Sequence, residues 1–232
     1  MSTAPNPEQR PVALITGASR GIGRAIAADL GTTHHVLVGG RDRAAVDAVV
    51  ATLPSAQPFV VELTDEGAVS AAVAEIGSLD VLVHSAGIAA LGTVADLPTQ
   101  SWRDVLEVNV IAPAMLTRLL LPVLRARQGL VVFINSGAGF TAGPTGSAYA
   151  ASKFALRALA DSLRAEERGQ LRVTSIHPGR VDTDMQVELQ RSLGRPYHPE
   201  EHLTPASVAA TVRLAVDAPP SASIDTLSIR PA

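Results

Sequence analysis

Short runs of aliphatic and β-branched residues alternate with longer helical patterns along the first third of the chain. The apolar runs cover residues 12–16, 35–38, 59–63 and 79–85, and helical patterns begin between them at Gly21, Asp42 and Asp65. Asp42 and Asp65 stand where an N-cap carboxylate accepts backbone N–H bonds. This alternation predicts βαβ units with right-handed crossovers in a parallel sheet.

The same alternation continues to the end of the chain. Strands are expected at residues 131–135, 173–177 and 224–229, and helices at 100–124, 147–168 and 204–216, with Pro113 as a kink in the first of these helices. Residues 181–203 carry Gly194, Pro196 and Pro199 and no clear pattern, which predicts an irregular segment that is functional or mobile. The whole pattern predicts an α/β fold, a doubly wound and mostly parallel seven-stranded sheet with helices on both faces.

Composition fits one domain of this class. The 232 residues are 47% hydrophobic but only 3% aromatic, so aliphatic side chains must build the core. We expect a single domain over residues 10–232. Residues 1–9 are expected to form a flexible tail, since they have neither the apolar centre of a signal peptide nor that of a membrane anchor.

Charge and residue usage exclude several classes of function. A net charge of −3 and a pI near 6.1 provide no basic field, so we predict neither nucleic acid nor membrane as a partner. The apolar residues 105–124 include Glu107, Asn109, Arg118 and two prolines, which argues against a membrane span. We expect a soluble, cytoplasmic protein. There is no cysteine, and no pair of histidines has convincing metal-ligand spacing, so no metal is predicted.

A glycine-rich turn follows the first strand and opens the first helix. In Thr16-Gly17-Ala18-Ser19-Arg20-Gly21-Ile22-Gly23, the glycines allow a sharp turn and a close approach to a pyrophosphate at the helix N-terminus. A tight strand-to-helix connection would use the same residues. The position of the turn inside a βαβ unit favours nucleotide binding.

Tyr149 and Lys153 are four residues apart in the helix expected at residues 147–168, so their side chains leave the same face one turn apart. A phenol is a weak acid, and a nearby ammonium stabilises the phenolate and lowers the pKa of the phenol. Such a pair can donate or accept a proton. The same spacing occurs by chance on exposed helix faces, and only the other motifs separate the two interpretations.

Ser136 precedes Tyr149 by thirteen positions. Together with the glycine turn, Tyr149 and Lys153, this serine resembles the short-chain dehydrogenase/reductase family, and the likeness covers nearly the whole chain. Asn109 is similar to the family's helix asparagine, and Pro178-Gly179 with Thr183 resembles its nicotinamide-contacting turn. The chain departs from the family at His84-Ser85-Ala86-Gly87, where Asn-Asn-Ala-Gly is usual, and at Glu62, where an aspartate commonly meets the adenine amino group.

The resemblance implies a Rossmann-like reductase that binds a nicotinamide cofactor. The implied catalytic roles are protonation of the alkoxide by Tyr149, support of that oxygen by Ser136, ribose binding and pKa depression by Lys153, and water binding by Asn109. Implied cofactor contacts are Gly17, Ser19, Arg20, Gly21, Ile22, Gly23, Arg41, Glu62, Leu63, Ser85, Ala86, Gly87, Tyr149, Lys153, Pro178, Gly179, Val181 and Thr183. The alternatives are that Ser136 only caps a strand end, Asn109 only satisfies a helix kink and Thr183 is only a turn hydroxyl.

The end of the second strand favours NADP(H). An NAD-specific site needs a carboxylate there to bind the adenosine ribose, but the sequence reads Gly39-Gly40-Arg41. Arg41 and Arg20 are expected to converge on a 2′-phosphate. Asp42 could supply the carboxylate instead, although the N-cap is its better use.

The sequence therefore predicts an NADPH-dependent carbonyl reductase or alcohol dehydrogenase for a small ketone, aldehyde or secondary alcohol. A 3-oxoacyl thioester reductase and a non-catalytic NADP(H) sensor are the alternatives, and the sensor class typically lacks the tyrosine or the lysine. Substrate contacts are expected from residues 88–91, 137–145 and 185–202. Apolar residues spread over two faces of residues 148–163, which predicts a homodimer or homotetramer whose seam also uses residues 100–124.

Overall fold

The computed structural model describes residues 10–232, and the tail expected at residues 1–9 lies outside that range. Seven strands form one sheet in the order β3-β2-β1-β4-β5-β6-β7, and every neighbouring pair is parallel. The strands are β1 (Val12–Ile15), β2 (His35–Gly40), β3 (Ala56–Val60), β4 (Val81–His84), β5 (Leu130–Ile134), β6 (Arg172–Pro178) and β7 (Thr226–Ile229). The predicted seven-stranded, doubly wound sheet is thus confirmed.

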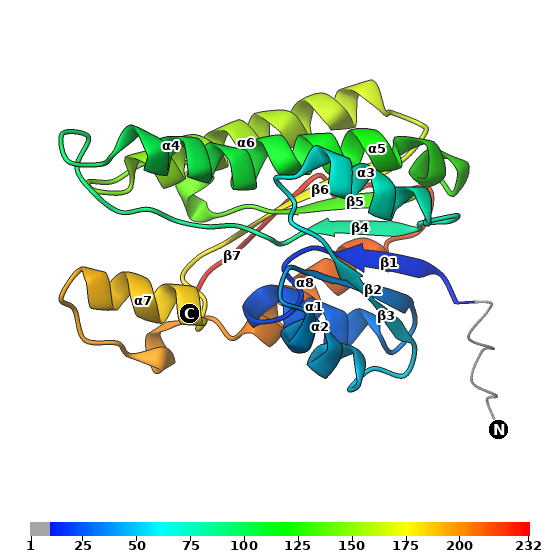
Figure 1. Ribbon diagram of the computed structural model, residues 1–232, viewed down its shortest axis with the longest axis horizontal. Helices are drawn as coiled ribbons and strands as arrows, with labels where there is room; N and C mark the ends of the chain where they lie inside the picture. The colour runs from blue at the N-terminus through cyan, green and yellow to red at the C-terminus, as the bar shows by residue number, and fades with distance from the viewer. Residues whose placement is uncertain (1–9) are drawn as a thin grey trace.

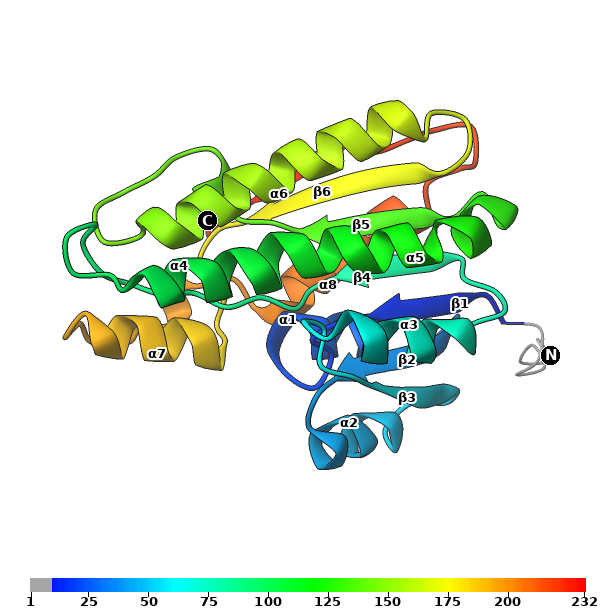
Figure 2. The same cartoon turned by 45° about the horizontal axis from the view of Figure 1, so that its top comes forward.

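Helices cover both faces of the sheet, as Figure 1 and Figure 2 show. One face carries α1 (Gly21–Leu30), α2 (Arg43–Val50) and α8 (Pro205–Val216). The other carries α3 (Glu66–Ala74), α4 (Thr99–Leu106), α5 (Ala112–Ala126) and α6 (Ser147–Glu166). The layers leave the carboxyl ends of the strands open to loops, and the short helix α7 (Asp184–Ser192) lies beside them.

Two hydrophobic cores lie on the two faces because successive strand side chains point in opposite directions. In β1, Ala13 and Ile15 pack towards α1 and α8, whereas Leu14 packs towards α5 and α6. Each strand at the centre of the sheet is therefore apolar at nearly every position, as expected for parallel strands covered on both faces.

The predicted helix starts agree with the structure more closely than the predicted boundaries of the third strand do. Asp42 and Asp65 are confirmed as N-caps, since they accept from the backbone N–H groups of Ala45 at 3.1 Å and Ala68 at 3.0 Å. β3 begins and ends three residues before the span predicted for it. It pairs only with β2, which ends at Gly40 opposite Val60, so the chain beyond that pair has no strand partner.

Residues Thr99–Ala126 form one continuous helix in which a π-helical turn, η2 (Glu107–Ile111), joins α4 to α5. The sequence predicts a kink at Pro113, but the irregularity lies one turn earlier. Proline has no N–H group, so Pro113 cannot donate to the carbonyl of Asn109 four residues before it. A π turn, with its longer hydrogen-bond spacing, accommodates this gap.

This long helix is apolar enough to cross a membrane by length and composition, a test that core helices also pass. Its apolar positions have another explanation in the fold. Leu116, Leu120 and Leu124 are buried against the sheet. The core accounts for them without a membrane.

The segment at residues 181–203 is not irregular, contrary to the expectation. It contains the nine-residue helix α7 and the short 3-10 turn η4 (Pro199–Glu201). Thr183 caps α7 by accepting from the N–H group of Gln186 at 3.3 Å. The apolar side chains Met185 and Val187 are at least 36% exposed, so no buried stripe marked this helix in the sequence.

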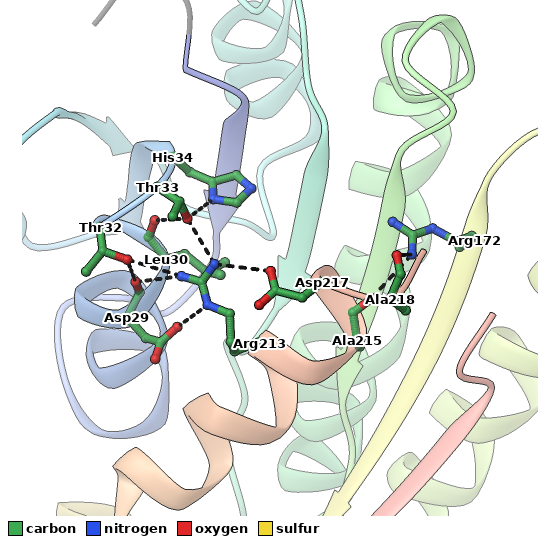
Figure 3. Close-up of polar contacts among 10 residues, drawn as sticks. All are labelled: Asp29, Leu30, Thr32, Thr33, His34, Arg172, Arg213, Ala215, Asp217 and Ala218. Carbon is green, nitrogen blue, oxygen red and sulfur yellow. Dashed lines mark hydrogen bonds and ion pairs between the residues drawn. The ribbon is translucent and has the colours of Figure 1, made fainter. Parts of the chain in front are cut away.

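At the amino-terminal edge of the sheet, Arg213 ties α8 to the end of α1 (Figure 3). Its guanidinium donates to Asp29 Oδ1 and to the Asp29 carbonyl, both at 2.7 Å, and to Thr33 Oγ1 at 2.9 Å. The buried His34 bonds the same threonine. This polar network stabilises the side of the fold that lies away from the carboxyl ends of the strands.

Candidate active site

A cavity of about 240 Å³ opens at the carboxyl ends of β1 to β4. The strand order reverses between β1 and β4, and open α/β sheets bind ligands at such a switch point. The cavity is lined by Gly17, Ser19, Arg20, Gly21, Ile22, Gly23, Gly40, Arg41, Val61, Glu62, Leu63, Ser85, Ala86, Gly87, Ile88, Val108, Thr183, Asp184 and Met185.

The glycine turn and the end of β4 are in close contact below this cavity. Thr16 Oγ1 accepts from the backbone N–H groups of Ser85 and Ala86, each at 3.1 Å. Gly17 has a φ of +65°, and a Cβ there would lie 2.8 Å from Ala86 Cα. Only glycine combines this backbone conformation with so close an approach.

Two arginines and two carboxylates line the cavity, together with the start of α1. The N–H groups at the start of α1 have no partner within the helix, so they favour an anion. Arg20 Nη1 lies 3.9 Å from Asp184 Oδ2, and Arg41 Nη1 lies 3.6 Å from Glu62 Oε2. All four side chains are exposed, so these ion pairs contribute little and leave both guanidiniums available to a stronger anionic partner.

The end of β2 brings no carboxylate into the cavity. Asp42 is used as the N-cap of α2, as its better use predicted. Gly40 lies against α2, where an added Cβ would lie 2.6 Å from Val46 Cγ2. A residue with a side chain at position 40 therefore requires Val46 to move.

Helix α6 carries Tyr149 and Lys153 on adjacent turns beside the cavity. Lys153 is buried, and its Nζ donates to the carbonyl of Ile134 at 3.0 Å. The same Nζ lies 5.6 Å from the centroid of the Tyr149 ring. Burial lowers the pKa of Lys153 to about 8.

Ser136 follows β5, and its side chain lies near the Tyr149 hydroxyl. Burial raises the pKa of Tyr149, and the nearby Ser136 side chain partly opposes that rise. The expected depression of this pKa is therefore wrong. Desolvation is the largest effect, and it holds the phenol in its protonated form.

Asn109 lies in the π turn and joins three segments. Its Nδ2 donates to the Ile88 carbonyl at 2.9 Å and to Ser152 Oγ at 3.0 Å, and its Oδ1 accepts from the Ile88 N–H group at 2.9 Å. A Cβ on Gly87 would lie 3.3 Å from Asn109 Oδ1 and 3.9 Å from Lys153 Nζ. Asn109 and Lys153 therefore flank the same part of the cavity wall, while water binding by Asn109 stays a prediction.

His84 stands where the family that the sequence resembles usually has asparagine. Its contacts lie inside the fold and not in the cavity. Its Nε2 lies 2.8 Å from Thr117 Oγ1, and its ring stacks on Phe133 with 4.9 Å between centroids. Burial lowers the pKa of His84 to about 3, so the ring is neutral. This pair links β4 to α5.

Most of the residues predicted to contact a cofactor line the cavity. Tyr149, Lys153, Pro178, Gly179 and Val181 do not line it. Lys153 lies behind Gly87, Gly179 donates to the carbonyl of Ile229 at 2.8 Å, and Val181 is buried in the core beside α8. Their cofactor contacts stay predictions. Sequence reasoning missed Val61, Val108 and Asp184, which no motif marks, although Val108 and Asp184 directly follow or precede predicted residues.

The chemistry of these groups fits a dinucleotide. The glycine turn offers backbone N–H groups, and Lys153 uses one of its three N–H donors on Ile134, which leaves two for ribose hydroxyls. Within residues 10–232, no group of three or more histidine or carboxylate side chains is arranged to hold a metal ion.

Comparison with known proteins agrees with this geometry. A family model described as short chain dehydrogenase matches residues 11–194. The uncharacterized short-chain type dehydrogenase/reductase y4eK of Sinorhizobium fredii is 34% identical over 230 residues, which cover 95% of this chain and 91% of that protein.

Two further relatives extend the comparison. Dehydrogenase/reductase SDR family member 7B of Mus musculus is 41% identical over 123 residues, 52% of this chain but only 38% of that protein, so the match spans well under half of its length. The alcohol dehydrogenase of the archaeon Thermococcus sibiricus, solved with 5-hydroxy-NADP, superposes with a TM-score of 0.88 at 25% identity and 97% coverage of both chains.

Proposed function

The chain belongs to the short-chain dehydrogenase/reductase family, and from that premise we propose that it is an NADPH-dependent carbonyl reductase or alcohol dehydrogenase. The substrate is a small ketone, an aldehyde or the corresponding secondary alcohol. One observation carries the proposal: Tyr149 lies beside Ser136 and Lys153, and Lys153 Nζ lies behind Gly87 in the wall of a cavity that has a dinucleotide-type glycine turn.

In the direction of reduction, a bound nicotinamide supplies the hydride to the carbonyl carbon. Tyr149 then gives the proton of its hydroxyl to the developing alkoxide. Because burial keeps the phenol protonated, Tyr149 is prepared to act as an acid. The Ser136 hydroxyl binds the same substrate oxygen and orients it, a contribution that grows as negative charge develops.

Lys153 has two tasks in this proposal. Its two remaining N–H donors bind ribose hydroxyls, and its charge stabilises the phenolate that is left after proton transfer. Asn109 holds the loop after β4 and the helix α6 in register, so that Lys153 keeps its place beside the cavity. We further propose that water near Asn109 returns the proton to the site.

The preference for NADP(H) rests on Arg20 and Arg41. Both guanidiniums line the cavity and both bind only weakly to their carboxylate neighbours, so a 2′-phosphate can recruit them. The glycine at position 40 supports the same choice, because β2 ends without the carboxylate that an NAD-specific site would need. The NADP derivative bound to the Thermococcus sibiricus relative is consistent with this choice.

A panel of substrates tests the proposal. Ketones, aldehydes, 3-oxoacyl thioesters and secondary alcohols are offered with NADPH or NADP, and turnover is followed at the nicotinamide absorbance. Reduction of simple ketones or aldehydes supports the proposal. Turnover restricted to acyl thioesters favours the 3-oxoacyl thioester reductase, and cofactor binding without any turnover favours the sensor.

Assembly and location complete the proposal. We propose a homodimer or homotetramer in the cytoplasm, without nucleic acid or membrane as a partner. Ala151, Phe154 and Ala158 are exposed on α6 while Leu156, Ala160 and Leu163 are buried, so α6 presents a second apolar face to a partner copy.

A further inference from the structure

His177 is fully buried at the end of β6, yet both of its ring nitrogens have partners. Nδ1 lies 3.0 Å from the carbonyl oxygen of Ser136, and Nε2 lies 2.9 Å from Ser175 Oγ. A carbonyl can only accept, so Nδ1 carries the proton. Nε2 is then the acceptor, and the Ser175 hydroxyl donates to it.

The strand register creates this contact. Phe133 and Ile134 of β5 pair with Ser175 and Ile176 of β6, so His177 comes to lie beside the residues that follow β5. No motif in the sequence marks the histidine, because its partner is a main-chain group on another strand.

The bonded carbonyl belongs to the serine that faces Tyr149. The Ser136 backbone also makes two local hydrogen bonds. Its N–H group donates to Asn135 Oδ1, and its carbonyl accepts from the Gly139 N–H group. Those partners come from the same short loop. The bond from His177 is different, because it anchors the loop to β6 and so to the rigid sheet.

The rest of the loop is packed against the same histidine. The Phe140 ring lies on the His177 ring with 4.2 Å between centroids, and the Arg157 guanidinium lies 5.0 Å from the Phe140 centroid. Arg157 also donates to the Gly139 carbonyl at 3.2 Å. The loop is thereby fixed on both sides, by Arg157 at Gly139 and by His177 at Ser136.

We propose that His177, as the Nδ1–H tautomer that the Ser136 carbonyl requires, is a positioning residue that fixes the Ser136 hydroxyl towards Tyr149 and the substrate oxygen. This inference rests on the proposed function, since it assigns His177 a role through Ser136. His177 contacts neither substrate nor cofactor in this account.

The test is a double-mutant cycle with Ser136. His177→Leu removes the donor and should lower kcat about tenfold to a hundredfold with the KM for NADPH changed less than about twofold. His177→Asn can present an amide N–H in place of Nδ1–H and should recover kcat to within about threefold. In the Ser136→Ala background, His177→Leu should change kcat by less than about twofold.

A loss of the same factor in both backgrounds, or full kcat in His177→Leu, would overturn the proposal. His34→Leu is the matched control, because it removes another buried imidazole, at the amino end of β2 and outside the cavity lining, and should leave kcat unchanged. If His177→Leu does not fold, His177→Phe replaces it in the cycle, since it removes the Nδ1–H donor and keeps a ring against Phe140. A kcat loss that vanishes without Ser136 supports the proposal, and one that persists overturns it.

The tautomer can be measured without turnover, which separates this inference from the proposed function. In ¹⁵N-histidine NMR spectra of the wild type, assigned with His177→Asn, the proton should be on Nδ1. A proton on Nε2 would overturn the inference even if the enzyme reduces every ketone tested. An Nδ1 proton together with no turnover of any substrate would contradict only the proposed function.

Discussion

The sequence predicted the positions of Lys153 and Tyr149 better than it predicted the pKa of Tyr149. Their spacing on α6 followed from the sequence, but the direction of the Tyr149 pKa shift did not. The sequence suggested a depressed pKa because an ammonium is near, whereas burial raises it. Burial depends on how β5 and the neighbouring loops close over α6, and no local pattern encodes that closure.

Tyr149→Phe should abolish most turnover while leaving the cofactor site intact. It deletes the acidic proton and keeps the ring packing, so kcat should fall about a hundredfold to ten-thousandfold. The Kd for NADPH, measured by nicotinamide fluorescence, should stay within about threefold. Retention of half of the wild-type kcat would rule out Tyr149 as the acid.

Lys153 should make stability depend on pH in alkaline solution. Its pKa is about 8 in the folded protein and ordinarily 10.5, so between these values the unfolded chain binds more protons and the free energy of unfolding rises with pH. Relative to Lys153→Met, the wild type should gain roughly 1–2 kcal/mol between pH 7.5 and pH 9.5.

Urea unfolding of both proteins at the two pH values measures that gain. The range stays below the ordinary pKa of tyrosine, and the pKa of Tyr149 is raised further, so the phenol does not titrate in it. A stability difference between the proteins that is the same at both pH values would contradict a lowered pKa for Lys153.

At the level of elements, α7 shows what the sequence analysis overlooked. Its apolar side chains face solvent, so the periodicity that revealed the buried helices is missing. A signal was present nonetheless. Thr183 and Gln186 have the spacing of a capping box, and Thr183 does cap the helix.

The polar network of Arg213, which joins α8 to the end of α1, should contribute to stability and not to catalysis. Arg213→Ala removes charge-assisted bonds to Asp29 from a largely buried guanidinium, and should lower the free energy of unfolding by about 2–3 kcal/mol. Its kcat should equal that of the wild type, because Arg213 bonds the segment that precedes β2, whereas the cavity lies at the carboxyl ends of the strands.

Arg118→Ala is the matched control for that variant. Arg118 also pairs with a carboxylate, Glu66, but both side chains are more than 60% exposed, so its loss should cost less than about 1 kcal/mol. Equal losses in urea unfolding for the two variants would show that the Arg213 network adds nothing beyond a surface ion pair.

For the whole molecule, the sequence was sufficient to predict a doubly wound parallel sheet of seven strands. Alternating strands and helices imply a parallel sheet, and the glycine turn after β1 locates the ligand edge of that sheet. The boundary of β3 and the lining of the cavity were harder to predict. Val61, Val108 and Asp184 of the lining come together only when β3, η2 and α7 are packed. Residues brought together in this way leave no spacing signal.

For the whole molecule we also predict that the chain assembles into a homodimer or homotetramer. The exposed Phe154, with Ala151 and Ala158 beside it, should be covered by a second copy. Sedimentation at micromolar concentration should give a dimer or tetramer, and Phe154→Glu should shift the wild-type species towards monomer because a buried carboxylate without a partner is costly. A wild-type monomer under these conditions would contradict the predicted seam.

The ratio of kcat/KM for NADPH to kcat/KM for NADH, with one carbonyl substrate held saturating, tests the proposed function most directly. If Arg20 and Arg41 each contribute about 1.5–3 kcal/mol by binding a 2′-phosphate, the ratio should be on the order of a hundredfold or more. Arg41→Ala and Arg20→Ala should each lower it, mainly through KM for NADPH. Gly40→Asp would be a less specific test, because a side chain at position 40 would disturb Val46. Equal efficiency with NADH and NADPH in the wild type would contradict the assignment of the cofactor.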